Sequence, residues 1–64
     1  MKKFYCVQTE IYSTGLVKAA VVREKLAQQC PPFTVRHLVG LKVSQIWFGS
    51  KDEAESAVVE VRRE

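Results

Sequence analysis

The sequence is poor in the residues that carry most metal and redox chemistry. Its 64 residues contain one histidine, His37, and two cysteines, Cys6 and Cys30, which form no Cys-x-x-Cys pair. A structural zinc site takes four such ligands at close spacing, so we expect neither a metal nor any other cofactor. We also expect two reduced thiols, because disulfides belong mainly to exported proteins and no export signal is evident.

Glycine is scarce too, and its three occurrences are isolated. None has the G-x-G-x-x-G or G-x-x-x-x-G-K-[ST] spacing with which a backbone cradles phosphates. Cys30 and His37 come nearest to a nucleophile and a base, but a triad also needs an orienting acid held by a scaffold. A chain of this length has little room for a ligand pocket of several hundred Å3. We therefore predict that the protein is not an enzyme.

Long apolar runs are absent as well. No stretch approaches the roughly 18 residues of a membrane span, so we expect no membrane association. The apolar stretch after Lys3 is only Phe4 to Val7, whereas the core of a secretion signal needs about 7–15 residues. We expect a mature first strand with a charged lead-in, and we take the cytoplasm as the default compartment.

What the sequence does contain is typical of a small globular domain. Hydrophobic residues make up 47% and charged residues 27%, which is too apolar for a disordered chain. We expect residues 1–64 to form one domain. A domain of this size buries only about 60% of the surface that its unfolded chain exposes. Small natural domains often add a partner subunit, so self-association fits this size.

Residues 3–12 predict the first strand. They are rich in aromatic and β-branched residues, contain no Gly or Pro, and alternate with a period of two. The alternation puts Tyr5, Val7, Thr9 and Ile11 on one face, and Phe4, Cys6, Gln8, Glu10 and Tyr12 on the other. A turn of three residues follows, and we expect Gly15 to take a positive φ there.

Residues 16–29 support two interpretations. As a helix, they would place Ala19, Val22 and Leu26 on one face, which Cys30 would share. As a strand, the first part of the segment would pair back on residues 3–12, and its three valines favour this because branched side chains are stiff at χ1. We favour the hairpin, ending near Lys25 with a helical turn after it, and keep the helix as the alternative.

Pro31 and Pro32 end whatever precedes them, because each lacks a backbone donor and disfavours helix in the residue before it. Residues 33–39 alternate, which predicts either a short strand or an extended connection. Residues 41–48 predict a further strand. This strand puts Ile46 and Phe48 on one face, and Val43, Gln45 and Trp47 on the other.

The closing helix, residues 51–63, is the clearest element. Ser50 and Glu53 match the S-x-x-E capping box, in which each side chain bonds the backbone N–H of the other residue. Acidic residues fill the positive first turn, and Arg62 and Arg63 fill the negative last turn. Small apolar residues recur at the i, i+3, i+4, i+7 spacing of a buried stripe: Ala54, Ala57, Val58 and Val61. A stripe this shallow lies close on a sheet.

Together these segments predict an α+β fold. We expect a small antiparallel β-sheet of three to four strands that opens with an N-terminal hairpin, and one C-terminal α-helix packed on one face. The alternative is β-α-β-α, with residues 16–29 helical. In the preferred fold one sheet face is left without a helix. We expect residues 33–39 to fold over that face, or else an apolar contact surface around Trp47 to remain, with a symmetric dimer formed through this face or through an edge strand.

Charge is divided between two parts of the chain. Residues 1–51 hold eight Lys and Arg against two Glu, a balance of +6. Residues 52–64 hold two Arg against five acids, a balance of −3, which leaves the formal net charge of +3. The strand region is therefore basic and the helix acidic.

Two functions from different classes fit these features. The first is a small non-enzymatic protein-interaction module, in its simplest form a homodimer, of the accessory kind that bacteria and their phages encode. The alternative is a nucleic-acid-binding module with a basic sheet surface. Its candidate binding residues are Arg23, Lys25, Arg36, Lys42 and Trp47. Of the two, we favour the protein-interaction module.

Overall fold

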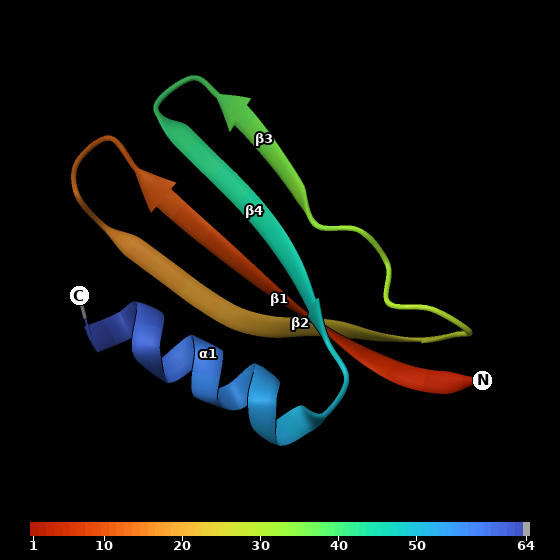
Figure 1. Ribbon diagram of the computed structural model, residues 1–64. Coiled ribbons are helices and arrows are strands. Elements are labelled where there is room, and N and C mark those ends of the chain that lie inside the picture. The colour runs from red at the N-terminus through yellow and green to blue at the C-terminus, as the bar shows by residue number, and fades with distance from the viewer. Residues whose placement is uncertain (64) are drawn as a thin grey trace.

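The computed structural model describes residues 1–63, with side chains for residues 1–61. Four strands precede one helix: β1 (Lys2–Tyr12), β2 (Val17–Ala27), β3 (Thr34–Leu38), β4 (Leu41–Phe48) and α1 (Lys51–Arg63). The strands form one antiparallel sheet in the order β2-β1-β4-β3, and α1 lies along one face of it (Figure 1). The predicted α+β fold with an N-terminal hairpin is confirmed, and the β-α-β-α alternative is wrong.

The strands β1 and β2 form a long hairpin closed by a tight turn. The Gly15 amide donates a hydrogen bond to the Tyr12 carbonyl at 3.0 Å, and Gly15 has the expected positive φ, at 94°. A side chain at this position would strain the backbone. The strand β2 continues to Ala27, so the helical turn expected after Lys25 is absent. Pairing with β1 along the whole strand overrides the helix propensity of these residues.

A β-bulge interrupts β2 at Val22. Cys6 pairs with Arg23 whereas Val7 pairs with Val21, so Val22 has no partner in the β1–β2 register. An extra residue in one strand reverses which of its side chains face each side beyond that point. Before the bulge the odd-numbered residues of β2 lie on the helix side of the sheet, and after it the even-numbered residues do.

The strands β3 and β4 form the second hairpin, which turns at Gly40 with a φ of 72°. Because residues 34–38 are an edge strand of the sheet, residues 33–39 do not fold over its open face, and that expectation is wrong. Residues 28–33 link the two edge strands (Figure 1). Within this linker, the Cys30 thiol donates to the Trp47 carbonyl at 3.6 Å, which ties the linker to the end of β4.

The helix α1 begins after Ser50, which forms its half of the predicted capping box. The Ser50 Oγ accepts a hydrogen bond from the Glu53 N–H at 3.2 Å, and the Ser50 carbonyl accepts one from the Ala54 N–H at 3.2 Å. The first bond satisfies one of the backbone donors that the start of a helix would otherwise leave unpaired, and the second is the first regular bond of the helix. The role expected of Arg62 and Arg63 in the last turn concerns side chains that lie outside the described ones.

The predicted apolar stripe faces the sheet. Ala54 is fully buried, whereas the other three members are half-buried: Ala57, Val58 and Val61. The helix packs against β2 and β1, contacts β4 less, and makes no contact with β3 through its described residues. We call the covered side of the sheet the helix face and the other side the open face. Within residues 1–63 no helix is long and apolar enough to cross a membrane.

The hydrophobic core is small. Among the described side chains, the buried hydrophobic residues are Phe4, Cys6, Val7, Ala19 and Ala54. The Cα extents of 40 × 23 × 13 Å leave room for only two layers, since a helix packs about 10 Å from a sheet. A two-layer molecule with a single helix keeps one sheet face in contact with solvent.

Candidate functional site

The open face collects most of the cations that the strands carry. Residues directly opposite each other in antiparallel strands share a face, so the register assigns each paired side chain to one side. Five of the seven basic strand residues lie on the open face: Lys2, Lys18, Arg23, Lys25 and Arg36. All four strands are described, and the one acid that they place on this face is Glu10. The open face therefore has a positive balance of charge.

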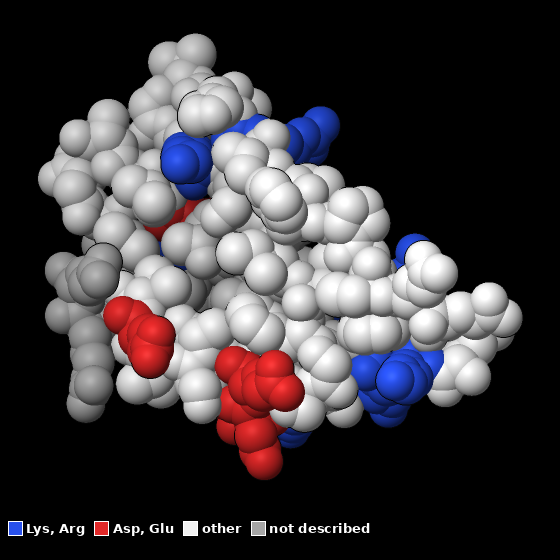
Figure 2. All heavy atoms as spheres, in the orientation of Figure 1, with Lys and Arg blue, Asp and Glu red and all other residues white. Residues whose placement is uncertain are grey.

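The acidic residues gather on the other side of the molecule. Those of α1 are exposed: Asp52, Glu53, Glu55 and Glu60. Figure 2 shows most of the visible Asp and Glu side chains over α1, and most of the visible Lys and Arg side chains over the strands. The acids of α1 thus lie on the helix side of the sheet, whereas most of the strand cations lie on the open face. Because the Debye length is about 8 Å at physiological ionic strength, the acids of α1 are largely screened from a ligand on the open face.

A chain of polar contacts crosses the open face. Arg23 donates to the side-chain oxygen of Gln45 at 3.4 Å, and Gln45 donates to that of Gln8 at 2.9 Å. Gln8 donates to one carboxylate oxygen of Glu10 at 3.4 Å, and the Tyr12 hydroxyl donates to the other at 3.3 Å. These contacts link the side chains of three neighbouring strands across the open face.

Two aromatic rings on this face lie beneath cations. The Arg23 guanidinium is 5.3 Å from the centre of the Trp47 ring, and the Lys18 ammonium is 5.8 Å from that of Tyr12. Both distances are within the roughly 6 Å of a cation–π contact. Trp47 lies opposite Cys6, six residues before Tyr12 on β1, so the two ring–cation pairs are about 20 Å apart.

Around Trp47, where an apolar contact surface was expected, the apolar side chains of the open face are largely covered. Phe4 is 7% exposed and Cys6 is fully buried, while Trp47 is half-buried. Cys6 lies between Arg23 and Trp47 in the register, and these two side chains meet above it. The apolar groups next to Trp47 are thus covered, whereas Leu38, at the far end of the same face, is 57% exposed.

Four of the five candidate binding residues share the open face: Arg23, Lys25, Arg36 and Trp47. Lys42 lies on the helix face, where it pairs with Ile11 of β1 and His37 of β3. The grouping of Lys42 with the other four was therefore wrong. Alternation along β4 puts Lys42 on the same side as Ile46 and Phe48, and the pairing of β4 with β1 then identifies that side as the helix face.

Sequence reasoning missed several residues of this surface. Lys18 and Tyr12 form the second ring–cation pair, and Gln8 and Gln45 form the centre of the polar chain. Alternation within β1 and β4 gives a signal for Gln8, Tyr12 and Gln45, because it groups them with Cys6 or Trp47. No signal in the sequence identifies Lys18, since its place depends on the pairing of β2 with β1.

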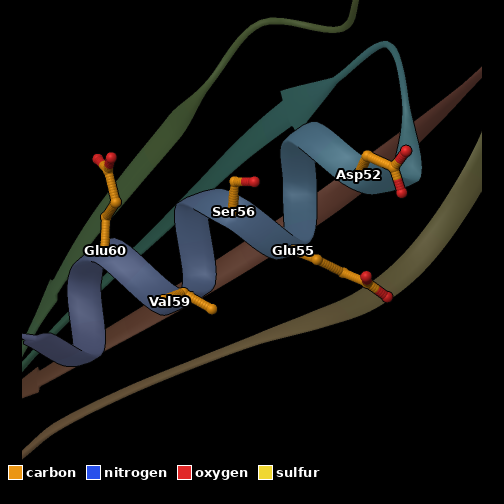
Figure 3. Close-up of a pocket in the computed structure, with 5 residues that line it drawn as sticks. All are labelled: Asp52, Glu55, Ser56, Val59 and Glu60. Carbon is orange, nitrogen blue, oxygen red and sulfur yellow. The ribbon is translucent and has the colours of Figure 1, made fainter.

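Several hollows mark the surface formed by the described residues. One lies on the open face, where it is lined by Gln8, Thr34, Arg36, Leu38, Val43 and Gln45. Another follows the outer side of α1, and Figure 3 shows its five side chains projecting from a single helix in different directions. Groups from one helix do not surround a ligand. Among the described side chains, no three His, Cys, Asp or Glu residues gather where they could hold a metal ion.

Comparison of the chain with protein-family models, with curated proteins and with solved structures gave no significant match. No function therefore comes to this chain from a relative, and only the geometry of its own residues bears on what it binds.

Proposed function

We propose that the protein is a small non-enzymatic module that binds single-stranded nucleic acid on the open face of its sheet. The observation that supports this most strongly is the sorting of charge between the two faces. The open face has five strand cations, one acid and two aromatic rings. Proteins bind single strands through positive surfaces that follow the backbone and through aromatic side chains on which bases stack.

The two ring–cation pairs suit an extended strand rather than a compact ligand. Their separation of about 20 Å spans several nucleotides, if each pair takes one base and one phosphate. A base would stack on Trp47 or Tyr12 while Arg23 or Lys18 moves aside to the phosphate. Stacking of this kind is worth about 1–3 kcal/mol per base and tolerates any sequence, because every base has a flat face. We expect little sequence specificity.

The first test is a titration of a fluorescein-labelled single-stranded oligonucleotide of mixed sequence, as DNA and as RNA, with a duplex for comparison. Fluorescence anisotropy gives the affinity, and Trp47, the one tryptophan in the chain, reports stacking by quenching of its own emission. Affinity must fall steeply with salt, with a slope of about −0.7 per phosphate contact on a logarithmic plot. Absence of binding at low salt would contradict the proposal.

Charge-removing variants locate the surface. We expect Arg36→Gln and Lys18→Gln each to weaken binding several-fold and to lower the salt slope by about 0.7. The matched control is Lys51→Gln, which removes an exposed cation at the start of α1, on the other side of the molecule. An equal loss for the control, or equally tight binding of polyglutamate, would mean general attraction of anions rather than a binding face.

A further inference from the structure

The helix face is only half covered. Because α1 packs mainly on β2 and β1, part of the face formed by β1, β4 and β3 has no second layer. Ile11, Val35 and Ile46 remain 42%, 42% and 45% exposed there, and we call these three residues the bare strip. Figure 1 shows α1 next to β2 and well away from β3. Exposed aliphatic side chains at the edge of an existing core are typical of an unfilled contact surface.

The bare strip is too small to hold a separate protein firmly. At about 3.3 Å per residue along β4 and 4.8 Å between neighbouring strands, the part of the sheet from β1 to β3 that carries the bare strip measures about 26 × 10 Å. A stable interface buries about 800 Å2 on each partner. The adjoining surface of α1 must therefore belong to the same contact. An occupant that uses both surfaces has to match an aliphatic strip and an acidic helix at once.

We propose that this occupant is a second copy of the chain, with α1 of each protomer lying on the bare strip of the other. The arrangement is a two-fold dimer in which one surface is complementary to itself. The uncovered half of each sheet lacks a helical layer, and the outer side of α1 is exposed to solvent. The helix of one protomer can therefore cover the uncovered half of the other. The contact area includes the strip and the helix of both copies.

Charge complementarity favours a second copy. At one end of the bare strip, Lys42 lies opposite Ile11 and beside His37 on the helix face. The outer side of α1 carries Val59, which is 55% exposed, among acidic residues that include Glu60 (Figure 3). In the dimer, Val59 packs on the aliphatic strip and acids of α1 meet Lys42. Both contacts occur twice by symmetry.

The test is sedimentation velocity over a range of protein concentration. We expect a dimer that dissociates on dilution, and Ile46→Lys should abolish it, because a charge would be buried at the centre of the contact. The matched control is Leu38→Lys, which adds the same charge at an exposed aliphatic position of β3 on the open face. A wild-type chain that is monomeric at every concentration overturns the proposal. So does a dimer that is lost in Leu38→Lys but kept in Ile46→Lys.

A charge reversal keeps the proposal testable if Ile46→Lys fails to fold. Lys42→Glu and Glu60→Lys should each weaken the dimer about tenfold, and the double variant should restore most of the affinity. Both residues are exposed, so neither change disturbs the core. Additive weakening in the double variant would mean that the two side chains do not meet across the interface, which would overturn the proposed packing of α1 on the bare strip.

Discussion

Cys6 is buried on a sheet face that no helix covers. The strand order gives it Arg23 on one side and Trp47 on the other, and the stacking of these two side chains closes the space above the thiol. Cys30, in contrast, is exposed in the linker. A stacked pair of this kind contributes about 0.5–1 kcal/mol at an exposed site, which is enough to control the access of a reagent to the thiol beneath it.

We predict that Arg23→Ala exposes Cys6 to thiol reagents. In a Cys30→Ser background, reaction of Cys6 with a small disulfide reagent should accelerate several-fold. The reason is that the cation–π contact with Trp47, worth about 1 kcal/mol, no longer holds a side chain over the thiol. Arg36→Ala is the control, since Arg36 lies on the same face but is not a neighbour of Cys6. Urea denaturation of each variant separates local access from general loss of stability. An unchanged rate in Arg23→Ala would mean that Arg23 does not cover the thiol.

Among the elements, β2 shows where prediction from the sequence fails and why. Alternation identifies β1 and β4, and the cap and apolar stripe identify α1, because each of these signals is local. In β2 the bulge at Val22 breaks the alternation, so the apolar residues on either side resemble a helical pattern. The same bulge puts Arg23 and Lys25 on the open face, because without it they would point toward the helix side. The sequence alone therefore could not define the candidate site.

The cap of α1 allows a prediction at the same scale. Ser50→Ala should lower the free energy of unfolding by about 1 kcal/mol, because the Glu53 N–H loses its side-chain acceptor. The measurement is urea denaturation followed by circular dichroism. Ser56→Ala is the matched control: Ser56 is exposed in the same helix, and alanine has the higher helix propensity there, so stability should hold or rise slightly. Equal losses in the two variants would exclude a capping effect.

At the scale of the whole molecule, the two proposed contacts use different sides of the sheet. A dimer formed through the helix faces leaves both open faces turned outward. One dimer could then hold two strands of nucleic acid, or two segments of one strand, and the second contact would gain from the high local concentration that the first creates. Binding and self-association are thus separable by variants, since the residues tested for each lie on opposite faces of the sheet.

The strand order also determines how the chain must fold. Each hairpin closes between neighbours in the sequence, but the central ladder joins β1 to β4, from Tyr12 with Leu41 to Tyr5 with Phe48. Bringing distant segments together costs chain entropy before any contact compensates for it, so the meeting of the two hairpins should limit the folding rate. Residues 28–33 connect the two hairpins and set how often they meet.

A longer linker tests whether the meeting of the two hairpins limits the folding rate. Six Gly and Ser residues inserted between Gln28 and Gln29 double the linker of residues 28–33, which should cost about 0.6 kcal/mol and slow refolding two- to threefold. Stopped-flow refolding below the concentration of self-association gives both rates, and the same six residues placed before Met1 serve as the control. Faster unfolding with unchanged refolding would show that the hairpins meet after the barrier. Otherwise the hairpins act as two early folding units, and their encounter is the slow step.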